Sequence, residues 1–414
     1  MLSRQRVVVT GLGIVAPNGI GKTAFWNSLL TRKSGIGRIT LFDASEFKSQ
    51  IAGEVKNFDL LNYYEPKTKV DRLARHTQFA LAAATLALAD AGLQGFKGDR
   101  DGGAVPVILG VSSSAMDVIA HGTDRLQTRG PARVPSYSID ASIPQQAASV
   151  LARELGFAAR AQTVSSACAA GLEAIGEACA AIWQGRTDLA VAGGGDAHIT
   201  PLPFACLDRA GLASRRNDDP ERASRPFDRD SDSGVISEGV AVVILENLQH
   251  ALARGARLYC ELTGYGNHGD PDPAVPCSGL PGAIRMALAN AGRRPEDIDC
   301  ICAHGPGHPV IDRVETQMIK EALGAHAYRV PVTSIKGVVG NPVAAAGPMQ
   351  LVACACILEQ NAIPPIANLE HPAPGCDLDY VMHDPRVARV GCILLNVHGL
   401  GGGNGSLIVE RVRA

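Results

Sequence analysis

Two residues far apart in the chain could act together as a nucleophile and its partner. Cys168 lies in "TVSSACAAGLEAIG", where a β-branched stretch meets a helix-like run. We expect the positive end of the helix dipole to lower the pKa of a thiol at that position. His304, in "CICAHGPGHP", follows an apolar run at a glycine-rich break, where functional loops tend to lie. A Cys–His pair from distant segments is an arrangement of nucleophilic acyl chemistry.

Simpler interpretations exist for both residues. A cysteine in an alanine-rich helix is most often buried and inert. On position alone, a reactive thiol and an inert buried cysteine are equally good interpretations of Cys168. His308 could join His304 in a metal site, but glycine and proline lie between them and no acidic third ligand is near, so no metal is predicted. The eleven cysteines form no CxxC pair, which favours reduced, buried thiols over disulfides or zinc.

Two further glycine-rich segments contain groups that packing alone does not require. In "SIKGVVGNPVAAAG", Lys336 and Asn341 interrupt a run of small residues. Lys336 could pair with Glu315 or could be an ordinary surface lysine. The turn in "NVHGLGGGNGSLIVE" could offer N–H groups to an oxyanion, or could be only a tight turn between two core strands.

The elements that must position these residues occur twice. Five short pairs recur in the same order, among them "VVVTGLG" with "CELTGYG" and "ALADAG" with "ALANAG". They predict two similar α/β halves, 1–250 and 251–414, in a layered α/β/α/β/α arrangement about a pseudo-dyad. The segment around Cys168 then corresponds to the segment around Asn341. We therefore expect these two residues to face a common centre.

Composition excludes several classes of function. With 414 residues, 46% hydrophobic and 19% charged, the chain has the balance of a compact globular protein. A net charge of -2 gives no reason to expect nucleic acid. No apolar run is long enough for a membrane span, and the start lacks a signal-peptide core, which predicts the cytoplasm. "APNGIGKT" lacks the first glycine of a phosphate-binding loop, so no nucleotide cofactor is expected.

Motifs of one kind run nearly from end to end. They are "RVVVTGLGIVAPNG", "VSSACAAG", "DLAVAGGGDAHITP", "SRPFDRDSDSG", "HGPGHPVIDRVE", "SIKGVVGNPVAAAG" and "NVHGLGGGNGSL". In this order the chain resembles the β-ketoacyl-[acyl carrier protein] synthases, the decarboxylating condensing enzymes of fatty acid and polyketide synthesis. The resemblance implies the thiolase-like fold. It also implies a homodimer, or a heterodimer with a related ketosynthase-like subunit.

The resemblance assigns roles to matching positions. Cys168 would accept an acyl group from the phosphopantetheine of a carrier protein or from coenzyme A, with no further cofactor. His304 would stabilise the enolate formed when a malonyl unit loses carbon dioxide. Lys336 would support His304 or the cysteine electrostatically, with Glu315 as its partner. The N–H groups of Cys168 and Leu400 would form the oxyanion hole.

One departure from the family's pattern falls on a catalytic position. Asn341 stands where the family has its second catalytic histidine. Its side chain can donate a hydrogen bond but cannot titrate near neutrality. A role that polarises the malonyl carbonyl survives this change, whereas a role in proton transfer does not. Related condensing enzymes use a Cys–His–Asn set.

Further departures from the family's pattern lie near the predicted entrance to the site. Pro306 and His308 replace threonines that hold the pantetheine arm, and Gly403 replaces another threonine. His398 and Leu400 stand where the family has phenylalanines, the second of them a gate. As a hypothesis, His308 or His398 takes over part of the missing imidazole's role; the alternative is that both only line the pocket.

Other positions match the family's substrate contacts. Ser113 lies on the stretch that resembles the floor of the acyl pocket, where a small residue would leave a longer or wider pocket. Lys67, Lys69, Arg72 and Arg209 match regions that contact the acidic acyl carrier protein, although basic surface residues are common everywhere.

The sequence therefore predicts a ketosynthase that joins a Cys168-bound acyl group to a malonyl-carrier unit with decarboxylation. The departures at the mouth favour polyketide or specialised fatty acid synthesis. Two alternatives stay open. One is a non-decarboxylating acyltransferase of the same fold. The other is a chain-length partner in a heterodimer, which would have no use for the Cys168 thiol.

Overall fold

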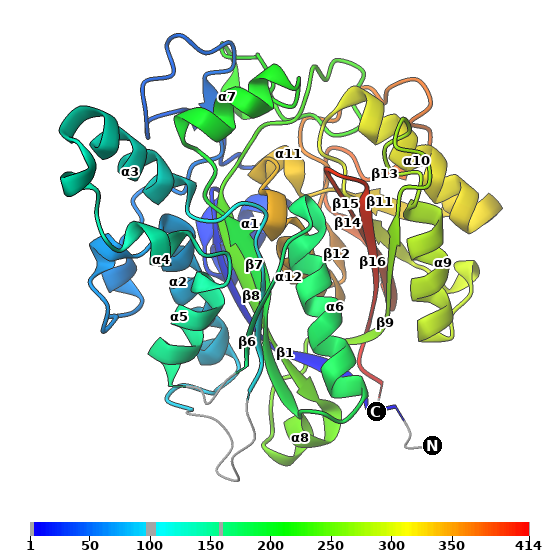
Figure 1. Ribbon diagram of the computed structural model, residues 1–414. Helices are drawn as coiled ribbons and strands as arrows, with labels where there is room; N and C mark the ends of the chain where they lie inside the picture. Colours follow the sequence, from blue (N-terminus) through cyan, green and yellow to red (C-terminus); the bar gives the residue numbers. More distant parts are fainter. Residues whose placement is uncertain (1–3, 97–104, 157–159, 414) are drawn as a thin grey trace.

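The strand order of the N-terminal half is repeated in the C-terminal half (Figure 1). The computed structural model describes residues 4–96, 105–156 and 160–413. In both halves the first three strands are antiparallel neighbours and the next two continue in parallel. The N-terminal order is β1 (Val7–Ala16), β8 (Gly239–Asn247), β7 (Leu189–Asp196), β5 (Val107–Gly110) and β6 (Ala161–Val164). The C-terminal order is β9 (Cys260–Gly269), β16 (Gly403–Glu410), β15 (Cys392–Gly399), β10 (Cys300–Cys302) and β11 (Pro331–Thr333), with β13 (Asp379–Tyr380) at the edge.

The two strand sets are joined where their first strands meet. β1 pairs with β9 in antiparallel fashion, with Val7 opposite Leu262 and Val9 opposite Cys260. Twelve of the described strands thereby form one continuous sheet, in which β2 (Gly19–Ile20) pairs only with β1. Because β1 and β9 are equivalent strands of the two halves, this antiparallel contact is what a pseudo-dyad between them requires.

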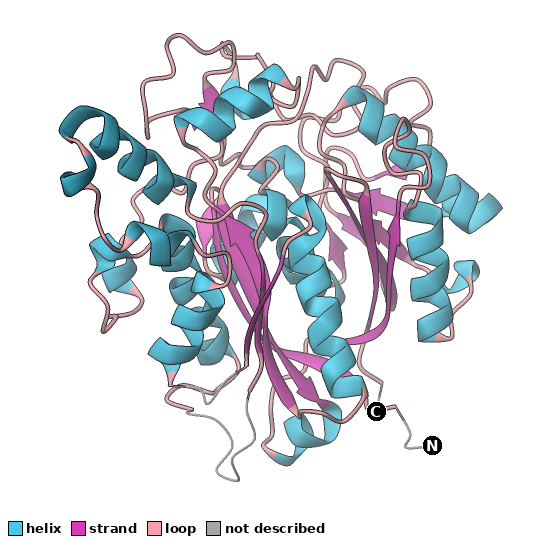
Figure 2. Cartoon of the chain, viewed as in Figure 1, coloured by secondary structure: helices cyan, strands magenta, loops and turns pink. Residues whose placement is uncertain are grey.

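Two helices of small residues lie between the two parts of the sheet, with strands of the N-terminal half to one side and strands of the C-terminal half to the other (Figure 1, Figure 2). α6 (Ala170–Trp183) packs on β7 and β5, and α12 (Ala346–Gln360) packs on β15 and β8. They also contact each other so closely that a Cβ on Gly171 would lie 2.6 Å from Cγ of Pro348. The glycines and alanines of these segments therefore allow the close packing of the central layer.

The outer faces carry the remaining layers. α2 (Arg75–Asp90) packs on β1 and β8 and α5 (Gln146–Leu155) on β5, whereas α9 (Leu280–Ala291) packs on β9 and α10 (Pro309–Leu323) on α9. The predicted duplicated α/β/α/β/α architecture is thus confirmed. The predicted domain boundary, between residues 250 and 251, lies inside α8 (Leu248–Ala253). It stays a prediction.

Shorter elements surround this frame. They are α1 (Lys22–Leu30), α3 (Met116–Arg129), α4 (Ser138–Ser142), α7 (Pro201–Arg209), α11 (Lys336–Val339), β3 (Gly37–Arg38), β4 (Ile51–Ala52), β12 (Ala362–Ile363) and β14 (Arg386–Val387). One segment, Val343–Gln360, has the length and apolar composition of a membrane span, but 83% of it is buried as the central helix of the protein. All eleven cysteines are free, and all but Cys206 are buried.

Candidate active site

Cys168 lies at a strained turn between β6 and α6. Ala167 has a φ of 52°, which a residue with a side chain rarely adopts, and a single 3₁₀ turn, Ala167–Ala169, leads into the helix. The second half repeats this geometry: Val343 has a φ of 50° and the 3₁₀ turn Val343–Ala345 leads into α12. Ala344 is therefore the positional counterpart of Cys168, so only one of the two turns carries a thiol.

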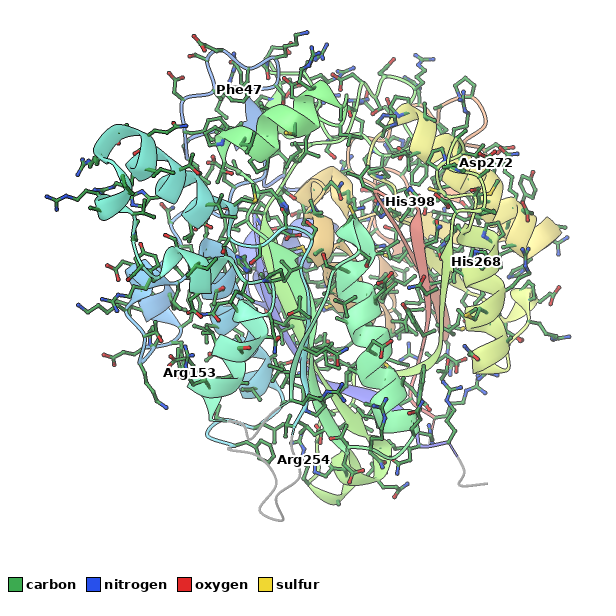
Figure 3. All side chains as sticks on the ribbon, viewed as in Figure 1. Phe47, Arg153, Arg254, His268, Asp272 and His398 are labelled. Carbon is green, nitrogen blue, oxygen red and sulfur yellow. The ribbon has the colours of Figure 1, made fainter. Side chains whose placement is uncertain are left out.

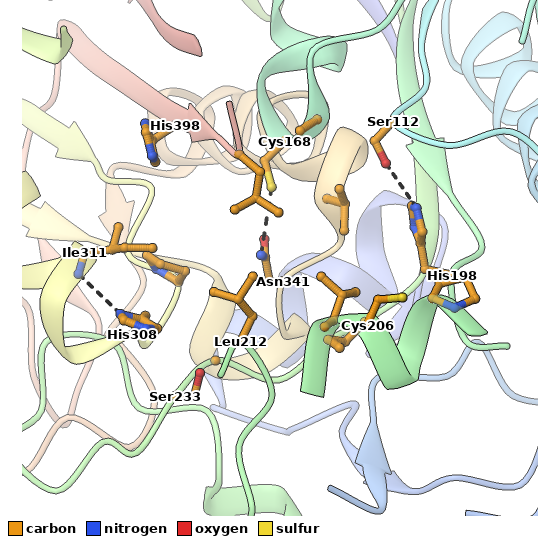
Figure 4. Close-up of a pocket in the computed structure, with 18 of the residues that line it drawn as sticks. Ser112, Cys168, His198, Cys206, Leu212, Ser233, His308, Ile311, Asn341 and His398 are labelled. Atoms are coloured by element: carbon orange, nitrogen blue, oxygen red, sulfur yellow. Dashed lines mark hydrogen bonds between the residues drawn. The ribbon is translucent and has the colours of Figure 1, made fainter. Parts of the chain in front are cut away.

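Asn341 approaches the thiol from the other half. Its side-chain Nδ2 lies 3.9 Å from Sγ of Cys168 (Figure 4). The backbone is fixed on both sides, because the Asn341 N–H donates to the carbonyl of Val235 at 2.6 Å and its carbonyl accepts from the N–H of Ser237 at 3.0 Å. The preceding Gly340 has a φ of 75°. Oδ1 of Asn341 is buried and has no partner among the described residues, which leaves an acceptor free for a ligand.

His304 follows β10 and is fixed by two neighbours. The backbone N–H groups of His304 and Gly305 donate to the two carboxylate oxygens of Glu315 at 2.7 and 2.8 Å. Nζ of Lys336 lies 2.8 Å from Nδ1 of the imidazole and 3.3 Å from Nε2. Both Lys336 and Glu315 are fully buried. The lysine thus acts directly on the ring, whereas the glutamate holds the loop that carries it.

The prediction of an ion pair between Lys336 and Glu315 was wrong. Within the described parts of the chain no ion pair joins them, because the Glu315 carboxylate is already engaged by backbone N–H groups. Its charge still acts at longer range. Burial lowers the pKa of Lys336 to about 8, while Cys168, Glu315 and Asp312 act in the opposite direction.

The expected lowering of the Cys168 pKa is also corrected. Burial raises the pKa of the Cys168 thiol, although Lys336 and the hydrogen bond from Asn341 oppose that rise. The thiol is 5% exposed, so the loss of hydration outweighs its favourable neighbours. The pKa of His304 falls well below its usual value through burial, with Lys336 and His398 adding to the effect. The imidazole of His304 is therefore neutral at physiological pH.

A cavity of about 310 Å³ brings most of the predicted residues together. Cys168, His304 and Asn341 lie in its wall. Of the other predicted residues it is lined by Ser113, Pro306, His308, His398 and Leu400. Gly403, expected in the substrate pocket, does not line it; it begins β16 and faces Ala169 and Glu173 of the nucleophile's helix.

Sequence reasoning missed a polar cluster in the same cavity. Nε2 of His198 lies 2.5 Å from Oγ of Ser113 and 3.1 Å from Oγ of Ser112. Asp196 supports the cluster by accepting from the N–H of Ser112 at 3.0 Å, and from the N–H of Ala344 at 2.9 Å. The sequence offered one indication of a functional role, which is that His198 lies just after the glycine-rich end of β7. Because His198 is far from Cys168 in the sequence, nothing indicated that the two residues share a cavity.

His308 and His398 have different surroundings. Nδ1 of His308 caps α10 by accepting from the N–H groups of Val310 at 3.2 Å and Ile311 at 3.5 Å. His398 lies in β15 (Figure 3). Its ring lies 6.2 Å from that of His304, centroid to centroid, at an interplanar angle of 87°. Only His398 therefore stands against the ring of the catalytic candidate.

The glycine turn after β15 also reaches the nucleophile. A Cβ on Gly399 would lie 3.3 Å from the amide nitrogen of Cys168 and 2.6 Å from the carbonyl oxygen of Ser166. Leu400 is next in the chain, lines the cavity and is 56% exposed. The backbone of the turn is thus close enough to the Cys168 amide for the two predicted N–H donors to serve one oxyanion, which stays a prediction.

The predicted basic contacts are all on the surface. Lys67, Lys69 and Arg72 lie around the 3₁₀ turn Val70–Arg72, and Arg209 ends α7, the helix that contributes Cys206 to the cavity. Among the described residues no group of three or more His, Cys, Asp or Glu side chains could hold a metal ion.

Comparison with known proteins decides the family. The family "Beta-ketoacyl synthase, N-terminal domain" matches residues 4–251, and "Beta-ketoacyl synthase, C-terminal domain" matches residues 259–370. The chain belongs to the β-ketoacyl synthase family. It is 40% identical over 415 residues to "Putative polyketide beta-ketoacyl synthase 1" of Streptomyces cyaneus, covering 96% of both chains. It is 36% identical over 417 residues to "3-oxoacyl-[acyl-carrier-protein] synthase 2" of Coxiella burnetii, covering 99% of this chain and 100% of the relative.

Solved structures give the same answer for the fold. The ishigamide ketosynthase/chain length factor structure superimposes with a TM-score of 0.92 at 32% identity, covering 99% of this chain and 100% of the other. A type II ketosynthase in complex with its acyl carrier protein, AntDE:AntF, gives a TM-score of 0.88 at 31% identity, covering 99% and 100%. The protein is thus a β-ketoacyl synthase with the thiolase-like fold, an acyltransferase of polyketide or fatty acid synthesis. The individual roles of its site residues stay predictions.

Proposed function

We propose that this β-ketoacyl synthase forms a carbon–carbon bond between an acyl group on Cys168 and a malonyl unit on a carrier protein, with loss of carbon dioxide. The observation that supports this most directly is the convergence of both halves on one thiol. Nδ2 of Asn341 lies 3.9 Å from Sγ of Cys168, and His304 lines the same cavity. A nucleophile and two hydrogen-bond donors therefore surround the space where a thioester would react.

Acylation is the first step. Sγ of Cys168 attacks the carbonyl carbon of the incoming thioester, and the carbonyl oxygen gains negative charge. In this proposal the N–H groups of Cys168 and Leu400 donate to that oxygen, consistent with the contact between Gly399 and the Cys168 amide. The bond from carbon to the pantetheine sulfur then breaks, which leaves the acyl group on Cys168, and the proton of the Cys168 thiol ends on the departing pantetheine sulfur.

Decarboxylation and condensation follow. The thioester oxygen of the malonyl unit accepts hydrogen bonds from the imidazole of His304 and the amide of Asn341. The bond to the carboxylate breaks, carbon dioxide leaves, and the electron pair forms an enolate. The enolate carbon attacks the acyl carbonyl, and Sγ departs. Asn341 suffices here because the step needs a donor and no titration.

Lys336 keeps His304 a neutral donor in this scheme. Nζ lies 2.8 Å from Nδ1 and 3.3 Å from Nε2, so the ammonium group can donate to whichever ring nitrogen is unprotonated, and it opposes a second proton on the ring. Neutral His304 can therefore donate from its protonated ring nitrogen to the enolate oxygen. The fall of the His304 pKa through burial keeps the ring from taking up a second proton.

Partners and setting are proposed on the same basis. We place the enzyme in polyketide or specialised fatty acid synthesis, in the cytoplasm, since its relatives include both polyketide and fatty acid synthases. Because the similar structures contain an acyl carrier protein complex and a ketosynthase/chain length factor, we propose that it binds a carrier protein and pairs with an identical or related subunit. Its acyl groups arrive on phosphopantetheine and no other cofactor takes part.

A labelled-malonyl experiment tests the proposal. The enzyme, alone and with a candidate partner subunit, receives an acyl-carrier donor and malonyl-carrier protein labelled in its free carboxyl carbon. We expect labelled carbon dioxide and a β-ketoacyl-carrier product, both absent in Cys168→Ala. Acylated Cys168 without carbon dioxide would instead indicate a non-decarboxylating acyltransferase. Full pathway output with Cys168→Ala would indicate a chain-length partner.

A further inference from the structure

Four histidines line the cavity: His198, His304, His308 and His398. Nδ1 of His308 accepts from backbone N–H groups of α10, so Nε2 of His308 carries the proton and can only donate. Nε2 of His198 is occupied by the hydroxyls of Ser112 and Ser113. Nζ of Lys336 lies 2.8 Å from Nδ1 and 3.3 Å from Nε2 of His304, so an ammonium group stands against that ring and opposes uptake of a second proton.

His398 has the opposite arrangement. Nδ2 of Asn404 donates to Oδ1 of Asp270 at 2.7 Å and lies 3.1 Å from the carbonyl of His268, which turns Oδ1 of Asn404 towards His398. That oxygen lies 3.1 Å from Nδ1 of His398 and can only accept. Nδ1 of His398 must then carry the proton, and Nε2 keeps its lone pair with no partner among the described residues.

The charges around His398 favour a neutral ring that can take up a proton. Asp270 places Oδ2 4.0 Å from Nδ1, and the ring of His304 lies 6.2 Å from that of His398, centroid to centroid. Burial lowers the pKa of His398, with the carboxylate and Asn404 acting against the decrease and Lys336 adding to it. At neutral pH the ring is unprotonated, and the carboxylate behind it stabilises the imidazolium that proton uptake would create.

We propose that His398, oriented by Asn404 and Asp270, is the general base of this cavity and receives the proton of the Cys168 thiol during acylation. The inference rests on the proposed function, because it concerns the acylation step. The S–H bond of Cys168 breaks as Sγ bonds to the acyl carbon, and the proton passes to Nε2 of His398. The bond from acyl carbon to the pantetheine sulfur then breaks, and that sulfur takes the proton from Nε2.

The chemistry of the site requires such a group. Burial raises the pKa of the Cys168 thiol, so the free thiolate is scarce at neutral pH. An amide such as Asn341 cannot accept a proton, and the ammonium group of Lys336 opposes proton uptake by His304. In the described wall of the cavity, His398 combines a carboxylate behind Nδ1 with an Nε2 that has no other partner.

Rapid-quench acylation followed by intact mass tests the assignment. The enzyme is mixed with an acyl-pantetheine thioester at pH 6 to 9, and the rate of Cys168 acylation is compared with His398→Gln and with His121→Gln, a change at an exposed position of α3. We expect His398→Gln to slow acylation about 100-fold, the usual scale of general-base catalysis, and His121→Gln to leave it unchanged. The unchanged enzyme should reach a plateau once His398 is neutral, whereas the variant's rate should keep rising with the thiolate fraction.

Chemical rescue separates proton transfer from structural support. Free imidazole should restore acylation in His398→Ala by at least tenfold and should not accelerate His398→Gln, whose cavity stays filled. Equal acylation rates of the unchanged enzyme and His398→Gln across the pH range would overturn the inference, as would a lack of rescue. If the unchanged enzyme itself is not acylated, the proposed function has failed and not this assignment alone.

Discussion

Nζ of Lys336 lies 2.8 Å from Nδ1 of His304, and both side chains are buried. An ammonium group costs free energy away from water, so its position against an imidazole needs a functional reason or a compensating charge. The carboxylates of Glu315 and Asp312 give partial compensation at a distance. The direct contact is with the ring: Nζ also lies 3.3 Å from Nε2, so the ammonium group opposes a second proton on His304 and keeps the imidazole neutral.

Replacing this lysine should reduce carbon dioxide release more than acylation. In Lys336→Met, His304 loses the ammonium group that contacts both of its ring nitrogens and polarises the imidazole as a donor. Loss of one hydrogen bond to a charged group is worth about 1.5–3 kcal/mol, which corresponds to a ten- to hundredfold decrease in the rate. The measurement is labelled carbon dioxide released by enzyme that has been acylated beforehand. An unchanged rate would show that the lysine does not support His304 in this step.

Decarboxylation should also depend on pH through Lys336. Because the pKa of this lysine is lowered to about 8, the ammonium group is present below that pH and is lost above it. The rate of carbon dioxide release from pre-acylated enzyme should therefore fall as the pH rises through about 8. Lys336→Met should lack this decrease, and a decrease that persists in the variant would assign it to another group.

The duplicated fold could be predicted from the sequence because its signal is repeated locally. Strand ends in T-G-x-G and helix ends in A-x-A-G each recur in order, and the structure aligns β1 with β9 and α2 with α9. Even the partnership of Cys168 and Asn341 followed from this symmetry. Ala344 as the true counterpart of Cys168 could not be predicted, because it depends on the positive φ of Val343.

The sequence could not predict how deeply the site residues are buried or which groups compete for their hydrogen bonds. The thiol of Cys168 was expected to have a lowered pKa from its helix terminus, but the extent of its desolvation is a property of the packed molecule. The carboxylate of Glu315 was expected at Lys336, but two backbone N–H groups of its own loop reach it first. His198 was missed for a similar reason, since only the folded sheet brings it to the serines after β5.

The turn before Asn341 should not tolerate a side chain. Gly340 has a φ of 75°, and a Cβ there would lie 2.8 Å from the carbonyl oxygen of Val235. Gly340→Ala should lower the free energy of unfolding by about 1–3 kcal/mol from backbone strain, and more from the clash. Gly255→Ala is the matched control, because Gly255 has a φ of 66° with open space around it. Equal losses of stability in urea unfolding would show that the contact with Val235 is unimportant.

Asn341 should contribute to decarboxylation and much less to acylation. Its amide lies 3.9 Å from Sγ of Cys168 and its Oδ1 is buried without a partner among the described residues, so the side chain is free to turn Nδ2 towards a substrate oxygen. Removing one donor to a developing oxyanion typically costs about 10²- to 10³-fold in rate. Asn341→Ala should therefore reduce carbon dioxide release by about that factor, while intact mass still shows acylated Cys168.

Asn341→His distinguishes a donor role from a role in proton transfer. An imidazole at this position can still donate to the malonyl carbonyl, so the variant should keep much more activity than Asn341→Ala. If Nδ2 serves only as a donor, the pH dependence of carbon dioxide release should stay that of the unchanged enzyme. A new titration near the pKa of a histidine, with a higher maximal rate, would mean that the asparagine limits a proton transfer. Full activity of Asn341→Ala would remove this residue from the decarboxylation step altogether.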